Sequence, residues 1–483
     1  MDTPHAHAAP QEQSVRRIPA GSAHLPDGRI AELVYDPELV RTRFAVYDGT
    51  TWTLANDILL SSAERLIPYS PRNNLLVNNV VLLPSMPEEY GSTAQLLDEI
   101  RSFIHRYVDV SPLYERIASS YVLFSWVYDA FNELPYLRIQ GEPGSGKTRF
   151  LLTVGSLCYK PIFASGASTI SPLFRILDAF RGTLIIDESD FRQSDERSEM
   201  VKILNNGNVR GFPVLRSEVS PQTKEFNPRA YAVFGPKIVA TRGLFEDRAL
   251  ESRFLTEPMG ERELRRDIPI NLPQAQQREA LSLRNKLLLF RFRNLAHCTV
   301  DPSLVDRAIE PRLSQIFVPL LSTVDDPAIR QELQGLAREY HDLMVGARGL
   351  EAEAQILEVV RELWTDATAS VALKDITETF AAKFGEEYER KITPKWVGYL
   401  LRTKLHLVPM KRHGIFVLPQ SEYAKLDRLS LRYDVPPPAS PEQSPEVPPV
   451  PLFPEQMPDA SMSTGTSTGP PNVPKSPQSL PPI

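Results

Sequence analysis

Cysteine is scarce in this chain, and its scarcity excludes several kinds of protein. Only two cysteines, Cys158 and Cys298, occur in 483 residues, and they lie far apart. Disulfide-stapled secreted domains and cysteine-based zinc modules need more ligands at closer spacing. Long apolar runs are also lacking, and the N-terminus has no apolar signal-peptide segment. We therefore expect a soluble, cytoplasmic protein without a membrane segment.

The chain also lacks an excess of positive charge. Lysine and arginine number 54 against 60 acidic residues, which gives a formal net charge of −6. The surface as a whole therefore does not attract nucleic acid, and any DNA contact must come from a local basic patch.

Composition and periodicity divide the chain into parts. We expect a flexible arm (1–27), a small β-rich module (28–92), a core of alternating strands and helices (93–270), a helical lid (271–350), a winged-helix module (351–433) and a disordered tail (434–483). Strands that alternate with helices predict a parallel α/β sheet. The tail is rich in Pro, Ser and Thr, which favours disorder and makes it a candidate binding segment for a protein partner.

One segment matches the phosphate-binding pattern G-x-x-x-x-G-K-[ST] at every position. It consists of Gly141, Glu142, Pro143, Gly144, Ser145, Gly146, Lys147 and Thr148. An apolar strand is expected before it (134–140) and a helix after it (146–157), which is the context that this pattern requires. Glycines let backbone N–H groups surround phosphates, Lys147 would reach the β- and γ-phosphates, and Thr148 would ligate Mg²⁺. The loop therefore predicts binding of ATP with Mg²⁺.

A second acidic motif completes this site. An apolar strand (183–186) ends in Asp187 and Glu188 within the same α/β block. In this arrangement Asp187 would hold Mg²⁺ through water, and Glu188 would orient and polarise the attacking water. The pair predicts hydrolysis as well as binding of ATP.

These motifs resemble those of AAA+ P-loop ATPases, and in particular the MCM-like and primase-helicase-associated ATPases of plasmids, phages and integrated elements. The strand at 237–240 and Thr241 resemble the sensor-1 strand, which implies that Thr241 helps to position the water. The segment 309–321 resembles the sensor-2 helix of the lid, with Arg312 near its start as a nucleotide contact.

The segment 245–255 resembles the part of AAA+ proteins that carries an arginine finger. The resemblance favours Arg253, directly before two apolar residues, over Arg248. It implies that this arginine reaches the γ-phosphate bound by a neighbouring subunit. The alternative is that either arginine forms a helix salt bridge with Asp247 or Glu251.

The insertion between the predicted strands at 183–186 and 237–240 resembles the pore hairpin of MCM-type and superfamily 3 helicases. Residues 209–216 and 229–234 would be its strands and Lys224 its basic tip, with Arg210, Arg216 and Arg229 nearby. Such tips in a ring could follow a phosphate backbone. The alternative is a solvated loop whose lysine has no role.

The predicted winged helix carries a local basic patch. We expect a helix at 393–403 and wing strands at 405–409 and 414–418. Between residues 390 and 420 there is no acidic residue, and the candidate DNA-binding residues are Lys395, Arg402, Lys404, Lys411 and Arg412. A winged helix used for protein packing is the alternative.

The resemblance implies an ATP-dependent DNA helicase or translocase that assembles as a ring, expected to be a hexamer, and acts in replication of a mobile element. The rival function is an ATP-driven switch or remodeller, such as a loader or a defence-system ATPase, that does not unwind DNA. The motifs of the nucleotide site would be the same in both.

Overall fold

The computed structural model describes residues 15–187, 194–217, 226–245, 247–260, 264–349, 352–364, 370–385, 388, 392–433 and 435. They form two compact units, one built on the chain up to Gln355 and the other on Ile356–Ser430. Among these residues, no helix combines the length and the apolar character that a membrane crossing requires.

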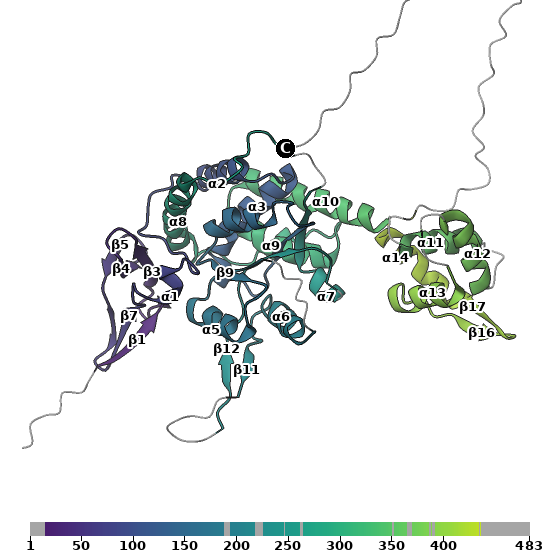
Figure 1. The fold of residues 1–483 in the computed structure, drawn as a ribbon, viewed down its shortest axis with the longest axis horizontal. Coiled ribbons are helices and arrows are strands. Elements are labelled where there is room, and N and C mark those ends of the chain that lie inside the picture. Colours follow the sequence, from purple (N-terminus) through teal and green to yellow (C-terminus); the bar gives the residue numbers. More distant parts are fainter. Residues whose placement is uncertain are drawn as a thin grey trace, which may run out of the picture. The chain divides into compact units, whose positions relative to one another are not determined.

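A five-stranded parallel sheet forms the centre of the first unit (Figure 1). In spatial order its strands are β14 (Phe254–Pro258), β8 (Tyr136–Gln140), β13 (Lys237–Thr241), β10 (Leu184–Asp187) and β9 (Ile162–Ser165). All four pairings are parallel, so all five strands end at the same edge. The predicted parallel α/β sheet is therefore confirmed, and the phosphate-loop motif follows directly on the strand β8.

Helices cover both faces of this sheet because the side chains of its strands alternate. Leu137 and Ile139 of β8 join one apolar cluster, whereas Tyr136 joins the other. The first cluster is covered by α2 (Thr93–Tyr107), α3 (Pro112–Ser125), α4 (Lys147–Val154), α8 (Gln274–Asn294), α9 (Pro311–Ser322) and α10 (Pro327–Gly349). The second is covered by α1 (Asn74–Val77), α5 (Ile170–Phe180), α6 (Ser194–Asn206) and α7 (Arg248–Glu251). The helices expected to form a lid, α8 to α10, thus contribute to the same core as the sheet.

Two small sheets form the N-terminal module, which starts earlier than expected. One sheet has the order β2-β3-β4-β5, and the other has the order β1-β7-β6. Their strands are β1 (Arg16–Ala20), β2 (Ser22–His24), β3 (Ile30–Asp36), β4 (Arg41–Tyr47), β5 (Trp52–Ala55), β6 (Ile58–Ser61) and β7 (Glu64–Pro68). The strands β1 and β2 lie within the predicted flexible arm, which corrects that prediction for residues 16–24. These polar residues are ordered by pairing, because β1 runs parallel to β7 and β2 pairs with β3.

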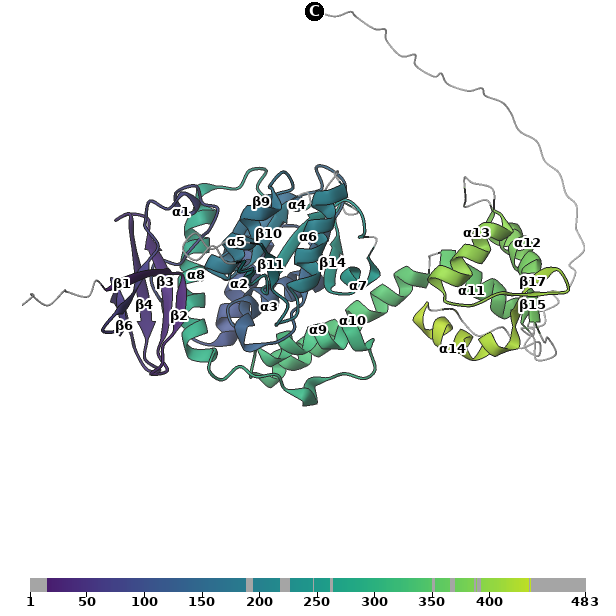
Figure 2. The same cartoon turned by 90° about the horizontal axis from the view of Figure 1, so that it is seen from below.

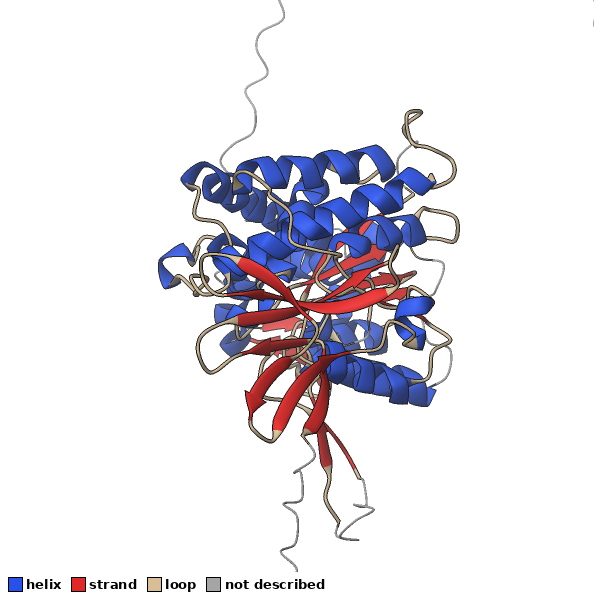
Figure 3. Cartoon of the chain, turned by 90° about the vertical axis from the view of Figure 1, so that its left-hand side faces the viewer, coloured by secondary structure: helices blue, strands red, loops and turns tan. Residues whose placement is uncertain are grey.

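The four-stranded sheet of this module is buried on both faces. Phe44 and Val46 of β4 pack with the three-stranded sheet, while Ala45 and Tyr47 face the central core. The ring of Tyr47 stacks on that of Phe292 in α8, with centroids 5.2 Å apart. Figures 2 and 3 show the strands of the module against α8 and the helical layer. The module is therefore packed onto the α/β core.

A buried ion network joins the module to the core. The Glu32 carboxylate of β3 lies 2.7 Å from Lys160 Nζ, and it accepts hydrogen bonds from Arg291 Nε at 2.7 Å and from the Tyr159 hydroxyl at 2.9 Å. Arg291 also donates two 2.7 Å hydrogen bonds to Asp129. Glu32, Lys160 and Arg291 are each only 1% exposed. Burial by itself would raise the pKa of the Glu32 carboxyl, but the charges of Lys160 and Arg291 hold that pKa below its ordinary value.

The second unit contains helices and a small antiparallel sheet of order β15-β17-β16. Its elements are α11 (Ala352–Leu363), β15 (Ser370–Ala372), α12 (Leu373–Phe384), α13 (Pro394–Tyr399), β16 (Met410–Arg412), β17 (Ile415–Pro419) and α14 (Tyr423–Arg432). The Thr393 hydroxyl accepts the Trp396 N–H and caps α13, as the sequence predicts.

The strand expected at 405–409 lies later in the chain, as β16. Residues 405–409 are not a strand, because His406 has a positive φ of 54°, which interrupts an extended backbone. Leu405 and Leu407 are buried there by packing, and their alternation imitates a strand pattern. The helix is also shorter than predicted, since a π-type turn, Leu400–Lys404, replaces its last residues.

Candidate nucleotide-binding site

The phosphate loop lies between β8 and α4 and depends on its glycines. Gly144 and Gly146 have φ values of 85° and 95°, in the region that favours glycine. A Cβ atom on Gly141 would lie 2.6 Å from the Met259 carbonyl oxygen and 2.8 Å from Ser145 Oγ. The three glycines of the motif are therefore required by backbone conformation and close packing, and the helix α4 starts directly after the last of them.

Lys147, the first residue of α4, turns its side chain back into the loop. Its ammonium donates to the carbonyl oxygens of Gly141 at 2.6 Å and Glu142 at 2.8 Å. The residue is only 8% exposed. A positive charge is thus held inside a loop of backbone at the N-terminus of a helix, which is an arrangement that attracts phosphate.

The loop meets the end of β10 through one short hydrogen bond. The Thr148 hydroxyl donates to Asp187 Oδ2 at 2.6 Å. Thr148 is the second residue of α4 and Asp187 is the last residue of β10, so the fold brings together two residues that are 39 positions apart. A hydroxyl and a carboxylate are oxygen ligands of the kind that Mg²⁺ prefers.

Three buried oxygen atoms at this edge of the sheet have no hydrogen-bond partner among the described residues. They are Ser145 Oγ in the loop, Asp187 Oδ1 at the end of β10 and Thr241 Oγ1 at the end of β13. The Thr241 carbonyl accepts the Gly141 N–H at 3.1 Å, so this strand end adjoins the loop. Buried polar atoms are rarely left without partners, and a bound ligand or ion is one explanation for such a group. The residues present therefore fit a nucleotide with a divalent cation.

Arg149 of α4 makes a contact that the phosphate-binding pattern does not predict. Its guanidinium donates to the carbonyl oxygens of Pro269 and Ile270. Ile270 itself is 90% exposed. Because that partner segment is distant in sequence and irregular, no pattern in the sequence points to the contact.

Arg253 and Arg312 lie at the opposite edge of the sheet from the loop. The Arg253 carbonyl accepts the N–H of Tyr136 at the start of β8, whereas the loop follows the end of that strand. Five strand residues span roughly 16 Å. The Arg253 side chain donates to Asn205, and its Nε has no partner among the described residues. The structure therefore does not bring Arg253 to the phosphate loop of its own chain.

Arg312 also lies near the start of β8. Its guanidinium is 3.9 Å from Glu133, which lies three residues before Tyr136, the first residue of β8. Burial lowers the pKa of Arg312, and the positive charge of Arg253 lowers it further. The expected contact between Arg312 and a nucleotide in its own loop is thus not supported by its position. The physical reason is that the start of α9 packs at the amino edge of the parallel strands.

The expected hairpin is present, with strands shorter than predicted. β11 (Val214–Arg216) pairs with β12 (Arg229–Tyr231) in antiparallel register, and Figure 1 shows the pair projecting beyond α5 and α6. The Arg216 guanidinium lies over the Phe174 ring and 3.5 Å from Glu199, and Arg210 donates to the Asp129 and Phe131 carbonyls. Both arginines are therefore engaged with the core near the base of the hairpin.

Several predicted site residues fall outside what the structure describes. Glu188 and Lys224 lie outside the described residues, and the same holds for the side chain of Arg248. Their roles therefore stay predictions.

The basic residues expected to contact DNA lie in the second unit. Lys395 is on α13, Arg402 and Lys404 are in the π-type turn, and Lys411 and Arg412 are on β16. All are exposed except Lys404, which is half-buried. Exposed apolar side chains of Met410, Ile415 and Phe416 accompany the last two.

Comparisons with known proteins give structural similarity only. No protein-family model and no curated protein matches the chain. An apo structure of the NrS-1 C-terminal region aligns over 80% of this chain and 96% of its own, with 11% identity and a TM-score of 0.31. A full-length MCM homolog from Methanopyrus kandleri aligns over 65% and 78%, with 12% identity and a TM-score of 0.32. JCV helicase aligns over 53% and 63%, with 14% identity and a TM-score of 0.22. Values this low say nothing about activity.

Proposed function

We propose that this chain is an ATPase that assembles into a ring, expected to be a hexamer, and moves along or unwinds DNA. The observation that supports this most is the hydrogen bond between Thr148 and Asp187, next to the phosphate loop into which the Lys147 side chain folds. It places a hydroxyl, a carboxylate and an ammonium at the carboxyl edge of a parallel sheet, where such folds bind ligands. Action in replication of a mobile element is what the motif resemblance implies.

The residues at the carboxyl edge of the sheet have separate roles in ATP binding and hydrolysis. The ammonium of Lys147 neutralises phosphate charge, and the loop backbone fixes the orientation of the triphosphate. Thr148 and Asp187 would hold Mg²⁺, which when bound supplies positive charge opposite the phosphate oxygens. Glu188 accepts a hydrogen bond from the attacking water and orients it, and Thr241 holds the same water from β13.

The amino edge of the sheet supplies the other half of the site. Arg253 and Arg312 both lie near the start of β8, about a strand length from the loop of their own chain, so neither serves that loop. In a head-to-tail ring this edge of one subunit meets the loop edge of the next. We infer that both arginines act on the nucleotide of a neighbouring subunit, where they stabilise charge on the transferred phosphoryl group.

Hydrolysis would be coupled to DNA through the β11–β12 hairpin and the C-terminal unit. The hairpin, with Lys224 as its basic tip, would follow the backbone in the ring pore. The C-terminal unit would act as a winged helix that contacts DNA through Lys395, Arg402, Lys404, Lys411 and Arg412.

The test measures ATP turnover and displacement of a labelled strand. We expect single-stranded DNA to stimulate hydrolysis and ATP to drive strand displacement. Glu188→Gln should keep ATP binding and lose turnover, because it removes the carboxylate that orients water. If only a protein stimulates the ATPase and no strand is displaced, the chain is a remodeller; if Glu188→Gln turns over normally, the assigned site is wrong.

A further inference from the structure

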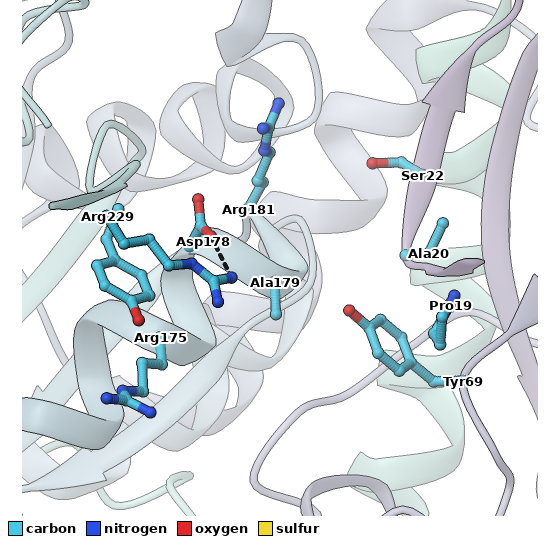
Figure 4. A pocket seen from close by; sticks show the side chains of 11 residues that line it. Pro19, Ala20, Ser22, Tyr69, Arg175, Asp178, Ala179, Arg181 and Arg229 are labelled. Atoms are coloured by element: carbon cyan, nitrogen blue, oxygen red, sulfur yellow. Dashed lines mark ion pairs between the residues drawn. The ribbon is translucent and has the colours of Figure 1, made fainter. Parts of the chain in front are cut away.

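A cavity of about 450 Å³ lies at the junction of the N-terminal module and the helix α5, away from the phosphate loop. Figure 4 shows residues that line it: Pro19, Ala20, Ser22 and Tyr69 belong to the module, and Arg175, Asp178, Arg181 and Arg229 belong to α5, its C-terminal end and β12.

Positive charge dominates the lining of this cavity. Three arginines, Arg175, Arg181 and Arg229, share it with one acid, Asp178. That acid is compensated, because its carboxylate lies 3.8 Å from Arg229 and also accepts the Ala232 N–H. Among the described residues, no hydrogen-bond or ion-pair partner is found for the Arg181 guanidinium. In a chain of net charge −6, this cavity is therefore a local concentration of positive charge.

Aromatic rings accompany these guanidinium groups. Arg175 and Arg229 lie over the ring of Tyr231, at 5.8 Å and 4.9 Å from its centroid. Tyr69 lines the wall formed by the module and stacks on Phe180 at 4.9 Å. Because Tyr231 is only 2% exposed and packs on Phe174, its ring holds the two guanidinium groups in place and does not stack a base. Guanidinium groups fixed in this way suit the phosphates of a nucleic acid.

A second cavity, of about 460 Å³, adjoins the first and shares Ser22 and Arg181 with it. The second cavity adds Arg210 and the 63% exposed ring of Phe212, close to the base of the hairpin. Its acid, Asp129, is already paired with the buried Arg291. These two adjoining cavities are together called here the arginine groove.

We propose that the arginine groove binds the phosphate backbone of a single strand of nucleic acid that enters or leaves the β11–β12 hairpin. The proposal rests on the proposed function, in which that hairpin contacts the strand. A cavity of about 450 Å³ is too small for a duplex, which favours a single strand. The N-terminal module, fixed by its buried ion network, forms the second wall of the site.

The test compares full-length variants by fluorescence anisotropy with labelled oligothymidylate and a slowly hydrolysed ATP analogue across a salt series. The variant is R175Q/R181Q. The matched control is R106Q/R293Q, which removes two arginines from surface ion pairs with Glu279 and Glu89. R175K/R181K keeps both charges. Equal melting temperatures establish that each variant is folded.

We expect R175Q/R181Q to bind the oligonucleotide about tenfold more weakly or worse. The negative slope of log K against log salt should become shallower by about 1.4, since two phosphate contacts are lost at about 0.7 each. The control should bind normally, and R175K/R181K should retain most of the affinity because lysine also contacts phosphate as a point charge.

Three results overturn the arginine groove. If wild type binds the strand and R175Q/R181Q matches the control, the groove is not part of the strand path, and the proposed function stands. If thymidine monophosphate binding is lost in R175Q/R181Q while oligonucleotide binding is unchanged, the groove holds a free nucleotide instead. If wild type binds no oligonucleotide under any salt condition, the groove and the DNA part of the proposed function both fail.

Discussion

At the scale of single residues, the loop lysine is the group whose position has the clearest chemical consequence. Lys147 is buried to 8% exposure and held by two carbonyl oxygens of the loop. Removing its ammonium takes away the charge that would meet the phosphates.

We expect Lys147→Ala to lower ATPase activity at least about a hundredfold, on the scale of losing one charged group that stabilises the transition state. The measurement is steady-state phosphate release. Lys286→Ala is the matched control, because Lys286 forms an ion pair with Glu99 on other helices. Wild-type turnover in Lys147→Ala would show that the loop is not the hydrolytic site.

Lys237, the first residue of β13, predicts a pH dependence of stability. It is fully buried, donates to the carbonyl oxygens of Val233 and Gly235 at 2.9 Å, and burial lowers its pKa from 10.5 to about 7. Between these values the unfolded chain binds more protons than the folded one, so stability should rise with pH. Lys237 alone should raise the free energy of unfolding by up to about 1.4 kcal/mol per pH unit in this range.

The measurement is urea unfolding of wild type and Lys237→Met from about pH 7.5 to about pH 9.5. In Lys237→Met the free energy of unfolding should rise less steeply with pH than in wild type, whereas Lys286→Met should keep the wild-type pH dependence. Equal slopes for wild type and Lys237→Met would contradict the lowered pKa of Lys237.

At the scale of elements, the buried ion network predicts how firmly β3 is attached to α8. Glu32→Ala would leave Lys160 and Arg291 buried with less compensating charge. Breaking a buried pair by removing one partner typically costs about 3–5 kcal/mol. Glu64→Ala, which removes the exposed partner of Arg16, should cost less than about 1 kcal/mol. Chemical unfolding gives both values, and similar losses for the two variants would mean that the network does not fix the module.

The sequence predicted those elements whose signal is local. The strand β8, the glycines of the loop, the acidic end of β10 and the Thr393 cap are each determined by neighbouring residues, and the structure has them. Strand order and the burial of β3 on both faces depend on contacts between distant segments, such as Glu32 with Arg291. No single segment carries that information.

The strand expected at 405–409, which is absent there, shows that a local pattern can also mislead. Leu405 and Leu407 alternate with polar residues as in a strand, but they are buried against helices around a left-handed His406. The position of Arg312 near the start of β8 was likewise not readable, because it follows from how α9 packs there. In both cases tertiary packing decided what the local pattern left open.

At the scale of the whole molecule, the two halves of the proposed site lie at opposite edges of one sheet. Hydrolysis should therefore depend on assembly. We expect the specific ATPase activity to rise with protein concentration in the range where the chain assembles, as measured by turnover and light scattering on the same samples. A monomeric chain with constant, full activity would contradict a shared site.

Arg253→Ala should bind ATP but hydrolyse it about a thousandfold more slowly or worse, because an arginine finger stabilises transition-state charge. Arg338→Ala, which removes an exposed partner of Asp306, is the control. Loss of ATP binding in Arg253→Ala would indicate a folding defect instead, which its melting temperature would reveal.

The most direct test mixes two inactive variants, Lys147→Ala and Arg253→Ala, in equal amounts under conditions that exchange subunits. Each variant carries the half of the site that the other lacks. If the halves meet between subunits, about a quarter of the interfaces in a randomly mixed ring pair an intact loop with an intact arginine, and ATPase activity should recover to about that fraction of wild type. Mixed assemblies that form but recover no activity would contradict a nucleotide site shared between neighbouring subunits.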